Sequence, residues 1–217
     1  MEKNLFTYIG LLISFATITG FNLLFKHFYG SQLDDPAAIA RELCIFLMVA
    51  ILFWIILKKE KLTLESIGLY PENFKRSLLW SLFTVLVCGI GLALSIIISQ
   101  QLGWTFGESM AFDKLSLGTI LLIVLRAGIA EEIFFRGYII ERLKALTGKV
   151  YFAAGLSLIP FALFHYTQGP AGILISFVLG GIFTGMYLWK RDLKANIIAH
   201  FIVDFVPNVL FPLLSGE

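Results

Sequence analysis

The stretch that decides the fold runs from residue 117 to residue 140 and reads LGTILLIVLRAGIAEEIFFRGYII. At about 1.5 Å per helical residue, it is long enough to cross about 30 Å of hydrocarbon. Its interior nevertheless contains four charged residues, which are Arg126, Glu131, Glu132 and Arg136. Ionised groups in lipid are costly, so two adjacent carboxylates in such a helix indicate a function.

Helical geometry predicts different surroundings for the two glutamates. Glu132 and Arg136 are four residues apart, so they share a face and can form an ion pair along the helix. Glu131 lies about 100° around the helix from Glu132, and its i+4 neighbour is Phe135 rather than an arginine. A desolvated carboxylate without a local cation is a useful base near neutral pH. Glu131 is therefore the predicted acid/base group, and Glu132 is the structurally paired one.

Arg126 belongs to no motif, and the sequence leaves two partners open for it, Glu131 and Asp204. A structural interpretation also exists for this stretch, in which its charged residues only hold neighbouring helices together.

The composition is that of an integral membrane protein. Of the 217 residues, 58% are hydrophobic and 15% are charged, whereas about a quarter of the residues of a soluble domain are charged. A net charge of +2 without a basic patch interleaved with aromatic residues argues against nucleic-acid binding. Cys44 and Cys88 lie in apolar runs, so no disulfide framework or Cys-x-x-Cys metal site is expected. The apolar run after Lys3 is too long for a signal peptide and is interpreted as a retained first transmembrane helix.

Seven apolar runs are long enough, or nearly long enough, to span a bilayer. They cover residues 5–25, 39–57, 78–99, 117–140, 150–165, 172–189 and 196–214. The predicted fold is an all-α, polytopic membrane helix bundle of about seven transmembrane helices. It forms a single transmembrane domain, residues 1–217, with a catalytic core at about 117–210.

The placement of Lys and Arg predicts the orientation in the membrane. If the seven helices alternate in direction, twelve of the 17 Lys and Arg residues fall on one side, Arg142, Lys144 and Lys149 among them. Three fall on the other side, Lys26, Arg41 and Lys114, and the remaining two, Arg126 and Arg136, lie within the fourth segment. Cytoplasmic loops are enriched in these residues, so the N-terminus is expected in the cytoplasm and the C-terminus outside a cell membrane.

Two of the three histidines lie in apolar segments. His165 follows Phe161 by four residues, so the aromatic ring can pack against the imidazole and orient it. In the last apolar run a polar residue recurs every four positions, at Asn196, His200, Asp204 and Asn208. Lipid does not satisfy such a stripe, so it is expected to face the bundle interior or a wet cavity.

Three short motifs follow one another along the chain: EEIFFR at 131–136, FALFH at 161–165 and HFIVD at 200–204. In this order, on successive hydrophobic segments and with Gly137 after the arginine, they resemble the CPBP family. This family contains the CAAX-type prenyl-protein endopeptidases and bacteriocin-processing enzymes and is also called the Abi family. The resemblance covers roughly residues 117–210.

The resemblance implies a metal-independent, glutamate-type intramembrane endopeptidase without a cofactor, acting on a membrane-associated peptide or protein within the lipid bilayer. It implies that Glu131 and His165 activate water and that Glu132 and Arg136 hold the site in shape. It further implies transition-state stabilisation by the last motif.

In that last motif, His200 and Asp204 are the implied stabilising residues. Asp204 departs from the asparagine common in the family: an amide donates a hydrogen bond to an oxyanion, whereas an ionised carboxylate does not. Asp204 must therefore act through His200 or be protonated. His200 can be the donor if it is protonated or is neutral with the proton on the correct nitrogen.

Other functions remain open at the level of sequence. A metal-dependent hydrolase could use Glu131, His165, His200 and Asp204 as ligands. A bacteriocin-immunity or scaffold protein would keep the fold without the chemistry, and proton-coupled transport finds no internal repeat in support.

Helix length exposes one difficulty for the protease interpretation. Counting along the predicted helices puts Glu131 and His200 about 8–9 Å from the inner edge of the hydrocarbon, but His165 about 22 Å from it. For the groups to meet, the run 150–165 must start deeper, tilt or break near Gly155 and Pro160. The cavity between them is expected to open toward the cytoplasm.

Overall fold

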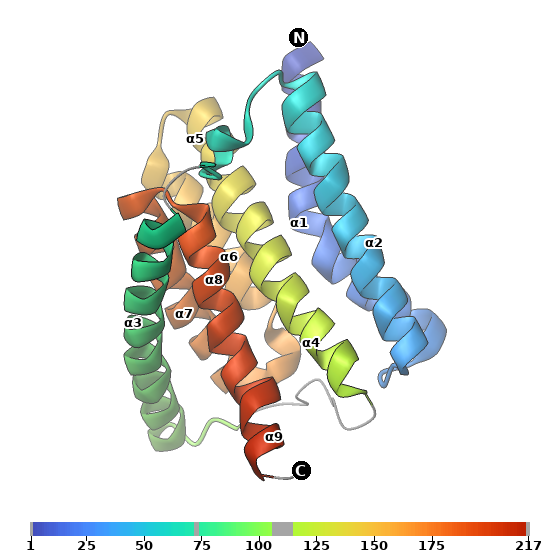
Figure 1. Cartoon of the computed structure of the whole chain (residues 1–217), viewed down its shortest axis with the longest axis vertical. Coiled ribbons are helices and arrows are strands. Elements are labelled where there is room, and N and C mark those ends of the chain that lie inside the picture. Colours follow the sequence, from blue (N-terminus) through green and yellow to red (C-terminus); the bar gives the residue numbers. More distant parts are fainter. Residues whose placement is uncertain (1, 72–73, 106–114, 216–217) are drawn as a thin grey trace.

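The computed structural model describes residues 2–71, 74–105 and 115–215. The chain is a bundle of helices packed roughly side by side (Figure 1). The α-helices are α1 (Glu2–Tyr29), α2 (Asp35–Trp54), α3 (Phe74–Gln101), α4 (Leu117–Arg126), α5 (Ile140–Thr147), α6 (Val150–Leu163), α7 (Gly169–Lys190), α8 (Leu193–Phe205) and α9 (Phe211–Ser215). Wider π-helical segments are η1 (Ile55–Lys59), η4 (Ala127–Ile139) and η6 (Val206–Leu210), and 3-10 turns are η2 (Leu64–Ile67) and η5 (Tyr166–Gln168).

The bundle is a membrane bundle, as the composition predicts. Among the described residues, five helical stretches are long and apolar enough to cross a membrane: Leu5–Tyr29, Asp35–Lys59, Phe74–Gln101, Tyr166–Lys190 and Leu193–Leu214. The shorter apolar helix α6 and the continuous helix 117–147, which carries the charged stretch, complete the seven predicted segments. The all-α fold class is therefore confirmed.

Polar side chains mark where several of these helices begin. Asp34, before α2, accepts a hydrogen bond from the backbone N–H of Ala37 at 3.1 Å, and Asp192 does the same for Ala195 at the start of α8. Such caps satisfy N–H groups that the first helical turn leaves unpaired. Gly148 ends α5 with φ 71°, a left-handed conformation that glycine adopts without steric cost. This turn reverses the chain, so that α5 and α6 pack against each other.

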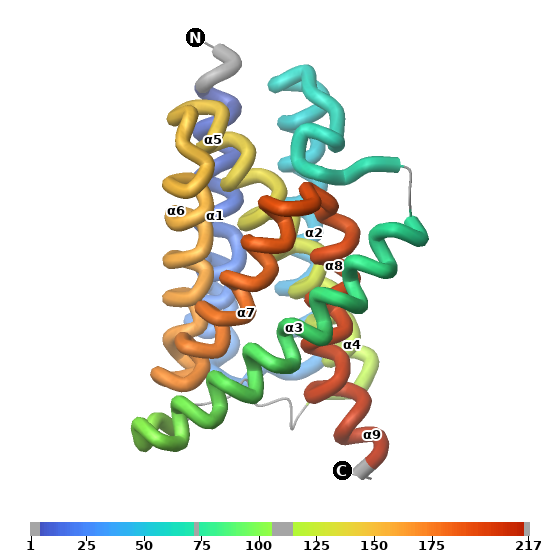
Figure 2. Tube along the Cα trace, turned by 90° about the vertical axis from the view of Figure 1, so that its left-hand side faces the viewer, coloured from blue at the N-terminus to red at the C-terminus, as the bar shows by residue number. Residues whose placement is uncertain are grey.

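The helix 117–147 lies at the centre of the molecule. Its middle segment η4 contacts α1, α2, α6, α7 and α8. Twelve of the 13 residues of η4 are buried, including Phe134 and Tyr138 at 0% exposure. α3 packs on α7 and α8 and crosses them obliquely (Figure 2). The residues with the unusual charges therefore sit in the part of the protein that has the most neighbouring helices.

The central helix continues well past the predicted boundary at Ile140. The hydropathy of residues 141–147 is low, but Arg142 is only 5% exposed because its guanidinium pairs with Glu60 at 2.8 Å. Glu131 then lies 16 residues before the end of α5, and His165 lies 15 residues after the start of α6. Since the two helices are joined by a tight turn, both residues reach about the same depth. The predicted mismatch in depth is wrong, and its cause is the helix boundary.

Candidate active site

Glu131 has an arginine partner that the α-helical spacing did not predict. Arg126 Nη1 lies 2.9 Å from Glu131 Oε1, and both side chains are buried. The two residues are five positions apart, and the π-helical turns of η4, which begin at Ala127, bring side chains with this spacing to one face. The prediction that Glu131 lacks a local cation is therefore wrong. Of the two partners left open for Arg126, the structure selects Glu131.

Arg126 is itself held by a residue outside the predicted core. Its Nε donates to Oε2 of Glu42 on α2, and Glu42 also accepts from Arg41 Nη2 at 2.6 Å. Glu42 is completely buried. Arg41, predicted to flank the membrane on the outer side, is a buried member of this cluster. The signal in the sequence is an adjacent Arg–Glu pair inside an apolar helix, the same kind of signal as the two carboxylates at 131 and 132.

Glu132 is the centre of a second buried network. Arg136 Nη1 lies 2.9 Å from Glu132 Oε1, the ion pair that the i,i+4 spacing predicts. The amide of Asn196 donates to Glu132 Oε2 at 3.0 Å, and His200 Nδ1 lies 2.9 Å from Oε1. The guanidinium of Arg136 also stacks over the ring of Phe161, 4.1 Å from its centroid. Glu132 and Arg136 are 0% exposed, so these contacts join η4 to α8 and α6 away from solvent.

His200 links the two glutamates. Its Nδ1 donates to Glu132, while its Nε2 lies 3.5 Å from Asp204 Oδ2 and 4.0 Å from Glu131 Oε2. Phe183 stacks on the imidazole, with ring centroids 4.9 Å apart. Three carboxylates around one imidazole favour its cationic form. The polar stripe of α8 faces the bundle interior here, as its spacing predicts.

His165 lies just past the end of α6. Its Nδ1 is 2.8 Å from the backbone oxygen of Phe161, and the two rings are 5.0 Å apart, the aromatic contact predicted from the i−4 spacing. A carbonyl oxygen only accepts hydrogen bonds, so Nδ1 carries the proton. In the neutral ring, Nε2 is then left with a free lone pair.

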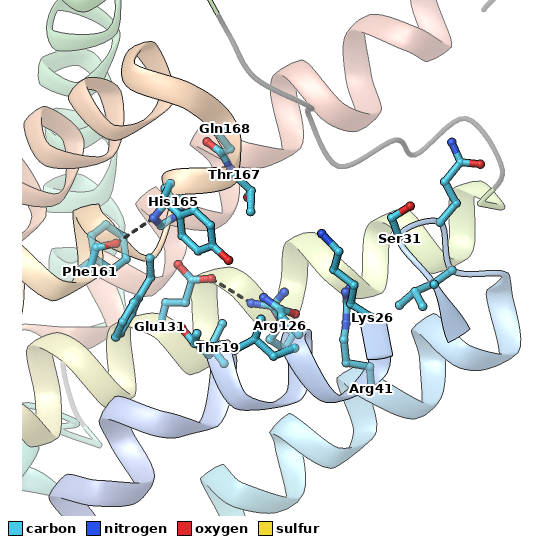
Figure 3. Close-up of a pocket in the computed structure, with 18 of the residues that line it drawn as sticks. Thr19, Lys26, Ser31, Arg41, Arg126, Glu131, Phe161, His165, Thr167 and Gln168 are labelled. Atoms are coloured by element: carbon cyan, nitrogen blue, oxygen red, sulfur yellow. Dashed lines mark hydrogen bonds and ion pairs between the residues drawn. The ribbon is translucent and has the colours of Figure 1, made fainter. Parts of the chain in front are cut away.

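Glu131 and His165 line one cavity of about 500 Å³. Figure 3 shows their side chains projecting toward it from η4 and from the end of α6. Phe135, Phe161 and Phe164 form the apolar wall beside them. His200 and Asp204 do not line this cavity, and they approach it through Glu131. The structure thus brings all the predicted site residues into one region, with only Glu131 and His165 on the cavity surface.

The cavity extends to the connector between α1 and α2, where Gly30, Ser31 and Gln32 line it and are exposed. This connector is at the end of the bundle opposite the start of α1 (Figure 1). The sequence predicts both a cytoplasmic N-terminus and a cavity that opens toward the cytoplasm. These two predictions cannot both hold, because the N-terminus and the cavity mouth lie at opposite ends of the bundle.

Among the described residues, no group of three or more His, Cys, Asp or Glu side chains is arranged to hold a metal ion. Glu131 and Glu132 each pair with an arginine, and the imidazole of His200 lies against Glu132.

Comparison with known proteins agrees with the motifs. Residues 113–206 match the family model of the type II CAAX prenyl endopeptidase Rce1-like proteins. Searches among curated proteins and among solved structures gave no match. The matched segment runs from just before α4 to the start of η6 and contains both buried glutamate networks, except for Glu42 and Arg41. The match, the three motifs and the helical membrane fold together support the CPBP family of CAAX-type proteases, with residues 113–206 as the segment similar to the Rce1-like proteins.

Proposed function

We propose that this protein is an intramembrane endopeptidase that hydrolyses a peptide bond of a membrane-associated peptide or protein, with Glu131 and His165 activating the attacking water. The observation that carries the proposal is that a carboxylate and an imidazole with a free Nε2 line the same cavity inside a membrane bundle. The name of the matched family, a CAAX prenyl endopeptidase, supports the same reaction class.

The chemistry follows from the two groups at the cavity surface. A water molecule between the Glu131 carboxylate and His165 Nε2 gives a proton to one of them while its oxygen bonds to the substrate carbonyl carbon. The carbon–nitrogen bond then breaks, and the departing amine takes up the proton. Arg126 holds one oxygen of Glu131 at 2.9 Å and so fixes the direction in which the carboxylate points.

The developing oxyanion needs positive charge close to the cavity wall beside Glu131. His200 approaches from behind Glu131, and its Nε2 lies within reach of two carboxylates, which supports a ring protonated on both nitrogens. An imidazolium there stabilises negative charge on a carbonyl oxygen placed beside Glu131. In this role Asp204 acts through His200, which accounts for an aspartate at a position where the family commonly has asparagine.

The experiment is cleavage of a farnesylated C-a-a-X peptide by the purified protein in liposomes. Glu131→Gln preserves the size of the side chain but removes the base, so we expect kcat to fall at least about 100-fold. Glu65→Gln makes the same change at an exposed position in η2 and should leave kcat unchanged. Full cleavage by folded Glu131→Gln protein would refute the proposed role.

Metal dependence is tested in the same assay. We expect EDTA and 1,10-phenanthroline to leave the rate unchanged, because the proposed mechanism uses only protein side chains. Inactivation by chelator followed by recovery with zinc would favour a metal-dependent hydrolase that uses the same residues as ligands.

A further inference from the structure

Two buried ion pairs join the helix α2–η1 to the central helix. Glu42 on α2 pairs with Arg126. Glu60, which directly follows η1, pairs with Arg142 at 2.8 Å. The two helices run in the same direction, so the first pair lies nearer the α1–α2 connector and the second nearer the start of α1 (Figure 1). Both glutamates lie outside the matched segment 113–206, whereas both arginines lie inside it.

The first of these pairs leads to a residue of the proposed hydrolysis. Arg126 donates through Nε to Oε2 of Glu42 and through Nη1 to Oε1 of Glu131, the second bond measuring 2.9 Å (Figure 3). Arg142 donates through Nε to Glu60 at 2.9 Å, but it is not one of the described residues that line the cavity of Glu131. The two pairs are therefore alike in chemistry and burial and differ in what lies beyond the arginine.

Glu42 is held at both carboxylate oxygens. Its Oε1 accepts hydrogen bonds from Nε and Nη2 of Arg41, at 2.7 and 2.6 Å, and its Oε2 accepts from Arg126. The residue is 0% exposed, so water does not compete for these bonds. A guanidinium is a rigid, planar fork, and a bond that fixes its Nε also fixes where its Nη1 lies. Glu42 thus determines the direction from which Arg126 approaches Glu131.

Without the carboxylate of Glu42, the remaining bond of Arg126 among the described residues is the one to Glu131. An arginine side chain has many rotamers, so this single ion pair can be kept in several geometries. A carboxylate that activates water must point at the water and at the carbonyl carbon, and a misplacement of about 1 Å can lower the rate about 100-fold. The rate of hydrolysis should therefore depend on Glu42, which itself does not touch the substrate.

We propose that Glu42 is a positioning residue of the active site, which holds Arg126 and through it sets the direction of the Glu131 carboxylate. This inference rests on the proposed function, since Glu131 is taken as the group that activates water. It makes α2 a working part of the site, so that the segment 113–206 does not contain every residue that full activity requires.

The test compares the two buried ion pairs by steady-state cleavage of the farnesylated C-a-a-X peptide in liposomes. Glu42→Gln keeps the size of the side chain and removes its charge, so kcat should fall about 10–100-fold while KM stays unchanged. Glu60→Gln makes the same change in the pair that does not lead to Glu131, and it should leave both parameters unchanged. Both substitutions should lower the midpoint of thermal denaturation, because each takes a carboxylate from a buried arginine. A loss of stability alone would then not account for the loss of kcat.

A double substitution tests whether Glu42 acts through Arg126. In protein that already carries Arg126→Met, adding Glu42→Gln should lower kcat no further, because the residue that transmits the effect is gone. Glu42→Asp covers the case in which Glu42→Gln does not fold. It keeps the charge but is one methylene shorter, so it should fold like the wild type and still lower kcat, since the shorter side chain does not reach both arginines.

Several results would overturn the positioning role while leaving the hydrolysis intact. They are wild-type kcat in either folded Glu42 variant, an equal loss of kcat in Glu60→Gln, a change in KM alone, or a further loss when Glu42→Gln is added to Arg126→Met. Failure of both Glu42 variants to fold would show that the residue is structural and would also overturn the role. Failure of the folded wild-type protein to cleave the peptide would refute the proposed function, and the positioning role with it.

Discussion

At the scale of single residues, the neighbours Glu131 and Glu132 differ in exposure and in the number of groups that hold them. Glu132 is 0% exposed and bonds to Arg136, His200 and Asn196. Glu132→Gln leaves Arg136 as a buried cation without its carboxylate, so we expect the free energy of unfolding to fall by about 3–5 kcal/mol. Glu131→Gln leaves Arg126 paired with Glu42 and should cost less stability. Thermal denaturation in detergent measures both, and a smaller loss for Glu132→Gln than for Glu131→Gln would contradict this assignment.

Arg126 is expected to position Glu131. Its planar fork bonds Glu42 through Nε and Glu131 through Nη1, and a lysine at this position has a single nitrogen for both carboxylates. Arg126→Lys keeps the charge but loosens Glu131, so kcat should fall at least about tenfold while KM stays unchanged. Steady-state kinetics separates the two parameters. Arg191→Lys, the same change in an exposed pair with Glu141, should leave both parameters unchanged, and a change in KM alone for Arg126→Lys would point to a role in binding.

The i,i+4 spacing correctly predicted the pairing of Glu132 with Arg136 and the contact between Phe161 and His165, because both depend only on local helix geometry. The sequence left the partner of Arg126 undecided between Glu131 and Asp204 for a physical reason. The sequence pattern assumes α-helical spacing, and nothing in the residues 127–139 themselves signals the wider turns of η4 that align Arg126 with Glu131.

At the scale of elements, the approach of η4 to α8 brings His200 to Glu132. A Cβ on Gly128 would lie 3.0 Å from the backbone nitrogen of Phe201 and 3.2 Å from the backbone oxygen of Ile197. Because backbone atoms do not move aside easily, Gly128→Ala should push α8 away and lower the free energy of unfolding by about 1–3 kcal/mol. Proteolytic cleavage should be lost in parallel, since His200 moves with α8.

Gly155→Ala is the matched control for that change. Gly155 lies inside α6, and a Cβ there would meet nothing within 4 Å. Because the added methyl group meets no other atom, Gly155→Ala should leave the free energy of unfolding unchanged or raise it by about 0.4–1 kcal/mol. If denaturation curves show the same shift for Gly155→Ala and Gly128→Ala, close packing between η4 and α8 is not what holds the site together.

Hydropathy located the seven segments but misplaced the end of the central one. It stops at Ile140 because Glu141, Arg142 and Lys144 follow, yet Arg142 is buried against Glu60. A pairing between residues 82 positions apart is not visible in a local window of sequence. For the same reason, a local window of sequence does not reveal that Glu42 pairs with Arg126, which lies 84 positions away.

At the scale of the whole molecule, the cavity mouth and the α5–α6 turn lie at opposite ends of the bundle. The cavity opens where α1 and α2 are joined, and the α5–α6 turn lies at the opposite end, near the start of α1 (Figure 1). The predicted inner side, which includes Arg142, Lys144 and Lys149, is the end with the α5–α6 turn. The positive-inside rule therefore predicts that the cavity mouth is on the outer face.

This orientation can be measured with single cysteines in a background in which Cys44 and Cys88 are replaced by alanine. Ser31 lines the cavity mouth and Thr147 ends α5, and both are exposed. A membrane-impermeant maleimide should label Ser31→Cys in intact cells, and it should label Thr147→Cys only after the cells are opened. The reverse pattern would put the mouth in the cytoplasm and overturn the charge-based orientation. Because the mouth is the way into the cavity from water, the side that is labelled is also the side from which water reaches Glu131.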